Sequence, residues 1–439
     1  MATLLVLADD LTGALDTGVQ FAKNGIEVRV LASMAAAGKS EKFSGGSGRI
    51  NAAEQAEALV INTDTRRCSP AEAEAVITRC LKKFAGIPYV YKKTDSTLRG
   101  NIGAELEALA ENGPQKTIPF IPAYPDLGRT TKGGHHFVNG IPLDKTESAF
   151  DALNPVTHSF IPGIITEESS IPVRIIPLGE KPAYASNSNS TAEIVIFDCN
   201  TNDDMRNIAA ALKRADLLHA TAGCAGFAEA LLGVIPFPEE IRTAKANKAK
   251  KVRIFSAFPY SPIPLLFVSG SRHPVSIGQI KAAMDKGVGG IPVEGKKLCS
   301  PEWLGGGEAV NLVKDCAGQL RKKGACILGT AESFGTKDGS TTENTSTEDA
   351  GNGISKGLGQ LVKNIIEETG HIHAAVFGGD TLLGIMEALG FDSIVPIDEI
   401  RPGIVHAMAG NLSIAAKSGA FGEPDIIEII IDFFHGPAS

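Results

Sequence analysis

Two adjacent carboxylates, Asp9 and Asp10, directly follow the apolar run Leu4–Leu7 near the start of the chain. That run is short and bulky enough for a buried parallel strand, and an apolar pattern with helical spacing follows from Ala14. A strand that turns directly into a helix places the residues between them at the carboxyl edge of a sheet, where ligands bind in open α/β folds. Capping of the helix by Asp10 or Thr12 is the commonest structural alternative, but it accounts for one carboxylate only. We therefore predict a functional role for the pair.

A second group of charged and hydroxyl side chains, residues 92–101 (KKTDSTLRGN), follows an expected strand at Tyr89–Tyr91. It combines three cations with the carboxylate of Asp95, and Arg99 can hold a carboxylate or phosphate through two parallel hydrogen bonds. A solvated surface turn in which Asn101 caps the next helix is the alternative. Cations beside a carboxylate at a sheet edge favour a binding site.

A long stretch from Pro122 to Leu143 is rich in proline, glycine and polar residues, and we expect it to be a loop. Loops of this length inside compact domains are usually functional or disordered. This one carries side chains that could close over an anionic substrate, namely Arg129, Lys132, His135, His136 and Asn139. For either histidine taken alone, a structural role is the better interpretation.

Two glycine turns in the second half each follow an expected strand and open a helix: Ser269-Gly270-Ser271 and Gly378-Gly379-Asp380-Thr381. Backbone N–H groups and the helix dipole at such a place favour phosphate. Neither turn fits the P-loop or the dinucleotide-binding fingerprint. Ordinary strand-to-helix turns remain the alternative, but two of them in one domain indicate an anion site.

The length and composition of the chain narrow its class. At 439 residues it exceeds what one core usually serves, and 43% hydrophobic and 21% charged residues are ordinary for a globular protein. The net charge of −8 disfavours a nucleic-acid partner, although a few local cations suffice for a small anion. We expect no membrane partner and a cytoplasmic location, because no apolar run reaches the length of a membrane span and the first strand leaves no room for a signal peptide. The seven scattered cysteines indicate neither zinc nor disulfides.

Strand-like runs alternate with helical patterns along most of the chain, which is typical of an α/β fold. In the first half, strands are expected at Leu4–Leu7, Val28–Leu31, Ala58–Ile61, Tyr89–Tyr91, Ile118–Ile121 and Ile194–Phe197. A helix should begin near Ser69, and others should cover Ile102–Ala110, Ala209–Leu212 and Ala225–Leu232, with a short turn at Thr221–Gly223. In the second half, strands are expected at Leu265–Val268, Gly290–Val293, Ala325–Leu328, Ala374–Phe377, Ile394–Ile397 and finally Ile426–Ile431. Helices there are expected at Pro274–Met284, Val310–Lys322, Gly359–Glu368 and Leu382–Leu389.

We expect two α/β domains, residues 1–240 and 255–439, each with a mainly parallel sheet flanked by helices. The boundary is indicated by a cation-rich stretch at 239–252 followed by prolines. Residues 330–353 are polar and lack periodicity, so we expect a mobile insertion without a catalytic role.

With these residues assembled, the chain resembles the four-carbon acid sugar kinase family. The matching segments occur in the family's order over nearly the whole chain: ADDLTGALDTGVQFA, KKTDSTLRGNIGAEL, PAYPDLGRTTKGGHHFVNGIPL, SGSRHP, FGGDTLLGIMEALG, EIRPGI and AAKSGAFG. The resemblance implies an N-terminal acid-sugar-binding domain, a C-terminal nucleotide-binding domain and an active site in the cleft between them. It implies ATP-dependent phosphorylation of the terminal hydroxyl of threonate, erythronate or 3-oxo-tetronate, with ATP and Mg²⁺ as cofactors.

The resulting site hypothesis has three parts. Asp10 orients the sugar hydroxyl or accepts its proton, with Asp9 as second choice and Asp95 as rival. The substrate-binding residues are Lys93, Ser96, Arg99, Arg129 and His135. The resemblance maps nucleotide contacts onto Ser269, Ser271, Gly378, Gly379, Asp380, Thr381, Gly419 and Gly422. The metal ligands stay unassigned, and a homo-oligomer is possible.

Three other functions remain open. A haloacid-dehalogenase-type phosphatase needs a second aspartate two positions after the first, and Leu11 and Thr12 stand there instead. A non-catalytic sugar-acid-binding protein would also have two domains that close on a ligand. A nicotinamide dehydrogenase is disfavoured because the dinucleotide fingerprint is absent.

Overall fold

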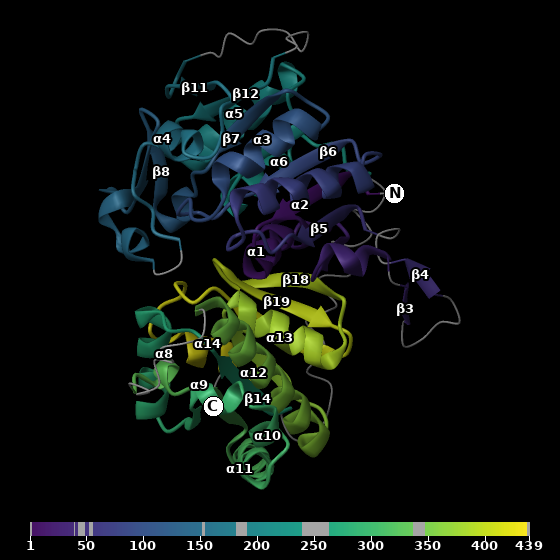
Figure 1. The fold of residues 1–439 in the computed structure, drawn as a ribbon, viewed down its shortest axis with the longest axis vertical. Coiled ribbons are helices and arrows are strands. Elements are labelled where there is room, and N and C mark those ends of the chain that lie inside the picture. The colour runs from purple at the N-terminus through teal and green to yellow at the C-terminus, as the bar shows by residue number, and fades with distance from the viewer. Residues whose placement is uncertain are drawn as a thin grey trace. The chain divides into compact units, whose positions relative to one another are not determined.

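The computed structural model of the chain describes residues 2–38, 40–42, 49–51, 56–151, 154–180, 191–238, 263–336 and 347–436. The chain divides into two compact units, Met1–Asn247 (unit 1) and Lys248–Ser439 (unit 2). Each unit is an α/β layer structure with a mainly parallel sheet and helices packed against it (Figure 1). The predicted fold class is confirmed.

The sheet of unit 1 has the strand order β11-β12-β7-β13-β6-β1-β5-β2, and its neighbouring strands are parallel. Its strands are β1 (Leu4–Ala8), β2 (Val28–Leu31), β5 (Ala58–Asn62), β6 (Tyr89–Lys93), β7 (Thr117–Ile121), β11 (Val173–Ile176), β12 (Glu193–Phe197) and β13 (Ala220–Gly223). From β1 the chain runs to β2, returns to β5 beside β1, and then crosses to β6 on the other side of β1. Such a reversal of direction is where open α/β sheets bind ligands.

Helices cover this sheet. They are α1 (Leu11–Ala22), α2 (Pro70–Lys83), α3 (Ile102–Asn112), α4 (Ile161–Thr166), α5 (Asn202–Arg214) and α6 (Ala225–Leu231), with 3₁₀ turns at Met34–Gly38, Pro125–Leu127, Leu143–Lys145 and Glu147–Phe150. The predicted start of α2 is confirmed, because Ser69 forms a capping box with Glu72. α2 and α3 pack side by side (Figure 1). Their apolar faces share a core with Leu5 and Leu7 of β1.

Two regions of unit 1 differ from the prediction. The expected loop 122–143 contains a small antiparallel sheet of β8 (Arg129–Lys132), β9 (His135–Val138) and β10 (Ile141–Pro142). The expected turn Thr221–Gly223 belongs to β13, in the middle of the main sheet. A Cβ on Gly223 would lie 2.2 Å from the Ile121 carbonyl oxygen, so glycine permits this close strand packing. A separate pair, β3 (Ser40–Lys42) and β4 (Arg49–Asn51), is antiparallel.

The sheet of unit 2 has the order β18-β19-β20-β17-β14-β16-β15. Its strands are β14 (Leu265–Ser269), β15 (Gly289–Val293), β16 (Ala325–Thr330), β17 (His373–Phe377), β18 (Ser393–Arg401), β19 (Ile404–Ala409) and β20 (Leu412–Lys417). The strands from β18 to β20 form an antiparallel meander, and β20, β17, β14, β16 and β15 are parallel neighbours. The path β14, β15, β16, β17 repeats the local order of β1, β2, β5, β6 in unit 1.

The helices of unit 2 are α8 (Pro274–Asp285), α9 (Gly295–Leu298), α10 (Pro301–Leu304), α11 (Gly307–Lys323), α12 (Thr347–Thr369), α13 (Gly379–Leu389) and α14 (Ile426–His435), with a 3₁₀ turn at Glu332–Phe334. The predicted strand at Ile426–Ile431 is wrong, because this run begins α14 and packs into the core of unit 2. A short continuous apolar run does not distinguish a strand from a buried helix.

The expected insertion at 330–353 is only in part irregular. Thr330 ends β16, and α12 begins at Thr347, so the prediction of an irregular segment is wrong for residues 347–353. The expectation of mobility falls in part on residues 337–346, which lie outside the described residues.

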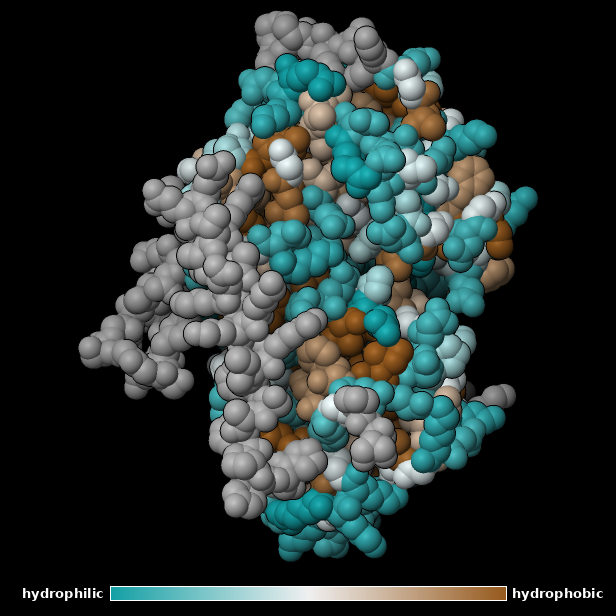
Figure 2. Space-filling view, turned by 180° about the vertical axis from the view of Figure 1, so that it is seen from behind, coloured by the Kyte–Doolittle hydropathy of each residue, from teal (hydrophilic) through white to brown (hydrophobic). Residues whose placement is uncertain are grey.

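Hydrophilic side chains cover much of the face shown in Figure 2, with hydrophobic residues visible between them. Among the described helices, none has both the length and the apolar character needed to cross a bilayer.

Candidate active site

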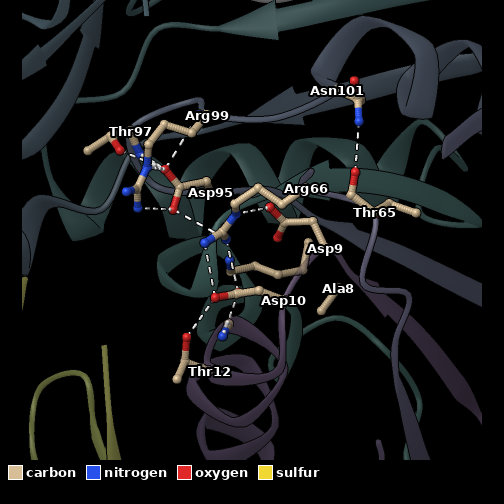
Figure 3. Close-up of polar contacts among 12 residues, drawn as sticks. Ala8, Asp9, Asp10, Thr12, Thr65, Arg66, Asp95, Thr97, Arg99 and Asn101 are labelled. Atoms are coloured by element: carbon tan, nitrogen blue, oxygen red, sulfur yellow. Dashed lines mark hydrogen bonds and ion pairs between the residues drawn. The ribbon is translucent and has the colours of Figure 1, made fainter. Parts of the chain in front are cut away.

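Three neighbouring strands of unit 1 bring a cluster of charged side chains to the carboxyl edge of the sheet. Asp9 and Asp10 follow β1, Arg66 follows β5, and Asp95 follows β6. Figure 3 shows the Arg66 guanidinium lying between the three carboxylates. The two acidic segments therefore lie at the same edge of the sheet.

Arg66 is the centre of this cluster, and the sequence analysis did not identify it. Its Nε donates to Asp9 Oδ2 at 2.7 Å, and its Nη1 donates to Asp10 Oδ2 at 3.0 Å. Its Nη2 lies 2.9 Å from Asp10 Oδ1 and 3.4 Å from Asp95 Oδ1. In the sequence, Arg66 stands shortly after an expected strand, in the segment Asn62–Arg67, and this position is the signal that could have identified it. The position of that strand beside β1 depends on the order of strands in the sheet, which the sequence pattern does not give.

Asp10 caps the helix that follows it, as the structural alternative predicts, and it also belongs to the charged cluster. Its side chain caps α1, accepting from the Gly13 N–H at 2.9 Å and from the Thr12 hydroxyl at 2.6 Å, and it pairs with Arg66. Burial alone would raise the pKa of the Asp10 carboxyl, but Arg66, Lys93 and Thr12 outweigh burial and lower the pKa. Asp10 is therefore ionised at neutral pH. Its side chain is 21% exposed, against 3% for Asp9, so Asp10 is the more accessible of the two.

Asp95 and Arg99 hold each other in a two-pronged ion pair. Arg99 Nε and Nη2 donate to the two Asp95 oxygens at 2.8 and 3.0 Å, and Nη1 donates to Asp151 at 3.0 Å. Burial would raise the pKa of the Asp95 carboxyl, but Arg99 and Arg66 hold this pKa well below its usual range. The predicted substrate ligand Arg99 is thus already paired with two carboxylates, which suits it to fixing Asp95.

Lys93 stands apart from the other cations of the cluster. It is the last residue of β6 and is 3% exposed. A Cβ built on Gly13 would lie 2.7 Å from Lys93 Nζ and 2.5 Å from Asp10 Oδ1, so the ammonium lies close to Asp10 across Gly13. Within the described part of the chain, no carboxylate forms an ion pair with Lys93. Lys93 is therefore available to an anionic ligand.

The neighbouring Lys92 has a different, internal function. Its Nζ forms a fully buried ion pair with Glu105 at 2.9 Å, and the other Glu105 oxygen accepts from Thr65. Asn101 Nδ2 donates to the carbonyl of Thr65 at 2.7 Å, and so it anchors this loop instead of capping α3. These contacts hold the residue that precedes Arg66.

The β8–β9 hairpin brings one of its two adjacent histidines to the cluster. His136 is buried and its Nε2 contacts the Ser96 carbonyl at 2.9 Å, beside Asp95. Burial lowers the pKa of His136 to about 4. The predicted ligand His135 is exposed, contacts Ser159 at 3.2 Å and packs on Phe160 instead. Arg129 lies on the same hairpin, and its charge interacts favourably with Asp95 and unfavourably with Arg99. Its Nη1 donates to the Leu127 carbonyl.

The glycines of this hairpin turn are already occupied. The N–H groups of Gly133 and Gly134 donate to the two Asp198 oxygens at 2.6 and 3.0 Å. Asp198 follows β12, so this carboxylate fastens the hairpin to the main sheet.

In unit 2, the predicted nucleotide residues converge at the carboxyl edge of β14, β17 and β20. A Cβ on Gly270 would lie 2.7 Å from Thr381 Oγ1, and a Cβ on Gly419 would lie 2.5 Å from Ser271 Oγ. The Gly378 N–H donates to the Lys417 carbonyl at 2.9 Å. The three sequence segments that carry these residues therefore form one contiguous surface.

Backbone geometry makes this surface suitable for an anion. Gly378 has a φ of 112°, which L side chains rarely adopt, and no side chain caps the start of α13. The N–H groups of the first turn of α13 therefore point out of the helix end without an intrahelical acceptor. Asp380, in that turn, is exposed.

Two of the residues predicted to bind the nucleotide, Ser269 and Gly422, are engaged in contacts within unit 2. Ser269 is 1% exposed, and its carbonyl accepts from Ser333 at 3.1 Å. Gly422 lies against Ile426, and its carbonyl accepts from Gln279 at 2.6 Å.

Among the described residues, no cluster of three or more histidine, cysteine, aspartate or glutamate side chains could hold a metal ion. A magnesium ion does not need such a cluster, because Mg²⁺ is commonly held by substrate phosphates, water and one or two carboxylates, and Asp380 supplies a carboxylate at the glycine turns.

Comparison with known proteins places the chain in a family. Residues 4–231 match a family model described as a sugar-binding N-terminal domain, and residues 266–427 match one described as a nucleotide-binding C-terminal domain. Two solved structures share the fold. One is a Salmonella typhimurium LT2 protein solved under the name of a putative tRNA synthase, with a TM-score of 0.72 and 21% identity over 98% of this chain and 99% of that one. The other is Haemophilus influenzae protein HI1011, with a TM-score of 0.64 and 18% identity over 98% of this chain and 100% of that one.

Curated relatives span nearly the whole chain. They include a D-threonate kinase of Salmonella typhimurium (29% identical, 95% of both chains), a D-erythronate kinase of Heliobacterium modesticaldum (25%, 99% of this chain and 97% of the relative) and a 3-oxo-tetronate kinase of Cupriavidus necator (26%, 96% and 95%). The chain therefore belongs to the four-carbon acid sugar kinase family.

Proposed function

We propose that this protein transfers the γ-phosphate of ATP to the terminal (C4) hydroxyl of a four-carbon sugar acid. D-threonate, D-erythronate and 3-oxo-tetronate are the candidate acceptors, because the curated relatives carry these names. We assign sugar-acid binding to unit 1 and nucleotide binding to unit 2, and we expect the reaction to take place in the cytoplasm, where ATP is available.

In unit 1, Asp10 orients the acceptor hydroxyl. It is ionised, partly exposed and fixed by Arg66, Thr12 and the start of α1, so it can accept a hydrogen bond without moving. Its lowered pKa makes it a weak base, which suits a loose phosphoryl-transfer transition state that needs orientation more than early proton removal. The side chains of Asp9 and Asp95 are 3% and 9% exposed, against 21% for Asp10, so they rank behind Asp10.

Lys93 binds the anionic part of the reacting pair. Its ammonium is the cation beside Asp10 that lacks a carboxylate partner within the described residues. It can bind the carboxylate of the sugar acid or the transferring phosphoryl group. Arg66 and Arg99 act indirectly, since their donors hold the three aspartates in place.

In unit 2, the N–H groups of Gly379 and Thr381 and the turns at Ser271 and Gly419 bind the ATP phosphates. Mg²⁺, where bound, neutralises phosphate charge, and Asp380 is the residue placed to contribute a carboxylate.

The chemical step is a direct displacement. The C4 oxygen forms a bond to the γ-phosphorus, the bond from that phosphorus to the β,γ-bridging oxygen breaks, and its electron pair leaves with ADP. The hydroxyl proton passes to Asp10 or to solvent. The step requires the nucleotide on unit 2 to meet the sugar acid on unit 1, within one chain or between two copies.

The observation that carries the proposal is the Lys93 ammonium, which has no carboxylate ion-pair partner among the described residues and lies beside the ionised Asp10 at the carboxyl edge of unit 1. The test is ADP formation from ATP and Mg²⁺ with a panel of four-carbon sugar acids, including both C2 and C3 epimers and shorter and longer acids. We expect one four-carbon acid to stimulate ADP formation well above the rate without acceptor. Stimulation by none of them would remove the proposal, and release of inorganic phosphate from a phosphorylated sugar acid in the absence of ATP would favour a phosphatase.

A further inference from the structure

A lysine outside the predicted site lies beneath the nucleotide turns of unit 2. Lys417 is the last residue of β20 and is paired with Phe377 at the end of β17, and its side chain is 1% exposed. It therefore lies under the point where the segments of Gly378 and Gly419 meet.

The ammonium of Lys417 is surrounded by neutral groups. Nζ donates to the carbonyl of Ser418 at 2.9 Å, to Ser276 Oγ at 3.3 Å and to the carbonyl of Gly419 at 3.5 Å. It also lies 4.3 Å from the centre of the Phe377 ring, a distance typical of cation–π contact. In the described part of unit 2, no carboxylate forms an ion pair with it.

These contacts fix the orientation of two peptide groups. The described backbone has no cis peptide bond, so each C=O and the following N–H point in opposite directions. Because the carbonyls of Ser418 and Gly419 point inward to Lys417, the N–H groups of Gly419 and Ala420 point outward. The Ser276 hydroxyl reinforces this arrangement by donating to the Gly419 carbonyl at 2.8 Å.

The outward N–H groups are free to bind a ligand. Neither Gly419 nor Ala420 donates its N–H to an acceptor among the described residues. Both residues are half-buried, and Gly419 lies against Ser271 of the other nucleotide turn. Two outward N–H groups above a buried cation make a concave site that favours negative charge.

We propose that Lys417 is a positioning residue of the nucleotide site, which orients the 418–420 turn toward the ATP phosphates and whose charge those phosphates neutralise. The proposal rests on the assignment of nucleotide binding to unit 2. Burial lowers the pKa of Lys417 to about 7, as expected for a cation that lacks a negatively charged partner before the nucleotide binds.

The test compares binding of ATP and of adenosine to wild type and to Lys417→Met by calorimetric titration. Methionine keeps the length and apolar stem of lysine and removes the charge and the donors. We expect ATP affinity to fall about 30-fold, the range of a lost charge-assisted contact, while adenosine affinity changes less than about twofold. Lys322→Met, on the exposed last turn of α11, is the matched control and should leave both affinities unchanged.

A purely structural role would weaken ATP and adenosine binding alike, and that result, or an unchanged ATP affinity, would overturn the inference. If Lys417→Met does not fold, Ser276→Ala decides, because it leaves the charge and removes the hydroxyl that holds Gly419. We then expect an ATP-selective loss of about threefold, and no loss would overturn the inference. Wild type that binds neither ligand would overturn the assignment of the nucleotide site as well.

Discussion

The first strand of each unit lies between the third and the fourth strand of that unit's path, so β1 has the same neighbours in unit 1 as β14 has in unit 2. At the carboxyl edge of unit 1, three carboxylates, two arginines and a lysine form a network of ionic side chains. At the same edge of unit 2, glycine turns and the uncapped start of α13 present backbone N–H groups. The same topology thus supports a site made of side chains in one unit and a site made of backbone in the other.

This difference has consequences for how each site can fail. In unit 1, removal of one charge leaves buried partners unpaired, which is costly in binding and stability. In unit 2, the N–H groups survive most substitutions, and the site fails when the backbone can no longer adopt its path.

The largest effect is expected for Asp10→Asn. The amide keeps the shape but loses the charge that orients the acceptor hydroxyl, so we expect kcat to fall about 10³-fold. ATP affinity should stay within about twofold of wild type, because Asp10 belongs to unit 1. ADP formation and calorimetric ATP titration measure the two quantities, with the exposed Asp203→Asn on α5 as control. An active Asp10→Asn enzyme would exclude Asp10 from this role.

The buried bases of the two units predict that stability rises with pH in two separate pH windows. The pKa of His136 falls from 6.5 to about 4 in the folded chain, so the unfolded chain binds more protons between these values. The stabilisation is present above pH 6.5 and is lost as the pH falls toward 4, by up to about 3 kcal/mol. His136→Gln should flatten this dependence, and His135→Gln, its exposed neighbour, should not. Chemical unfolding followed by circular dichroism measures it.

Lys417 should make the stability of unit 2 depend on pH in the alkaline range. Its pKa falls from 10.5 to about 7, so unit 2 gains stability as the pH rises through this window. Trp303, the single tryptophan, lies in α10 of unit 2 and reports its unfolding selectively by fluorescence. A slope that is equally steep in Lys417→Met would contradict the buried-lysine explanation.

Arg66→Met should weaken sugar-acid binding about 100-fold, because three carboxylates then repel the substrate anion and one another. The free energy of unfolding of unit 1 should fall as well. Arg67→Met, at the exposed adjacent position, is the matched control. Unchanged sugar-acid binding by Arg66→Met would show that the cluster does not form the acid site.

The smallest effect is expected in unit 2, for Gly419→Ala. Its Cβ would lie 2.5 Å from Ser271 Oγ, so one of the two turns has to move. We expect ATP affinity to fall about 10-fold, with sugar-acid binding unchanged. Gly318→Ala in α11, where the added Cβ meets no atom within 4 Å, should leave both unchanged. A loss of sugar-acid binding in Gly419→Ala would contradict the division of tasks between the units.

The elements that carry the two sites could be predicted from sequence because their strands are short apolar runs followed by polar residues. Asp9, Asp10 and Asp95 come directly after such runs, and the glycine turns come directly before helices. Arg66 could not be placed with them, since its contact with Asp9 depends on β5 lying beside β1. No strand was predicted to end at Lys417, and its burial becomes evident only with the packing of α8 and β17 around it.

The errors have equally local causes. Residues 220–223 (ATAG) are small and resemble a turn, yet their size is what lets β13 fit between β6 and β7. The β8–β9 hairpin consists mostly of polar residues around the Gly133-Gly134 turn, so no apolar period marks its strands, and Asp198 fastens it from a distant segment. The isoleucine run of α14 satisfies strand and helix patterns alike.

The most direct test of the account follows the γ-phosphate itself by ³¹P NMR in a reaction of ATP, Mg²⁺ and the accepted sugar acid. We predict that the γ-phosphate signal of ATP decreases while a phosphomonoester signal, coupled to the protons on C4, increases by the same amount. Appearance of inorganic phosphate in its place, or of an ester at another carbon, would contradict the proposed reaction.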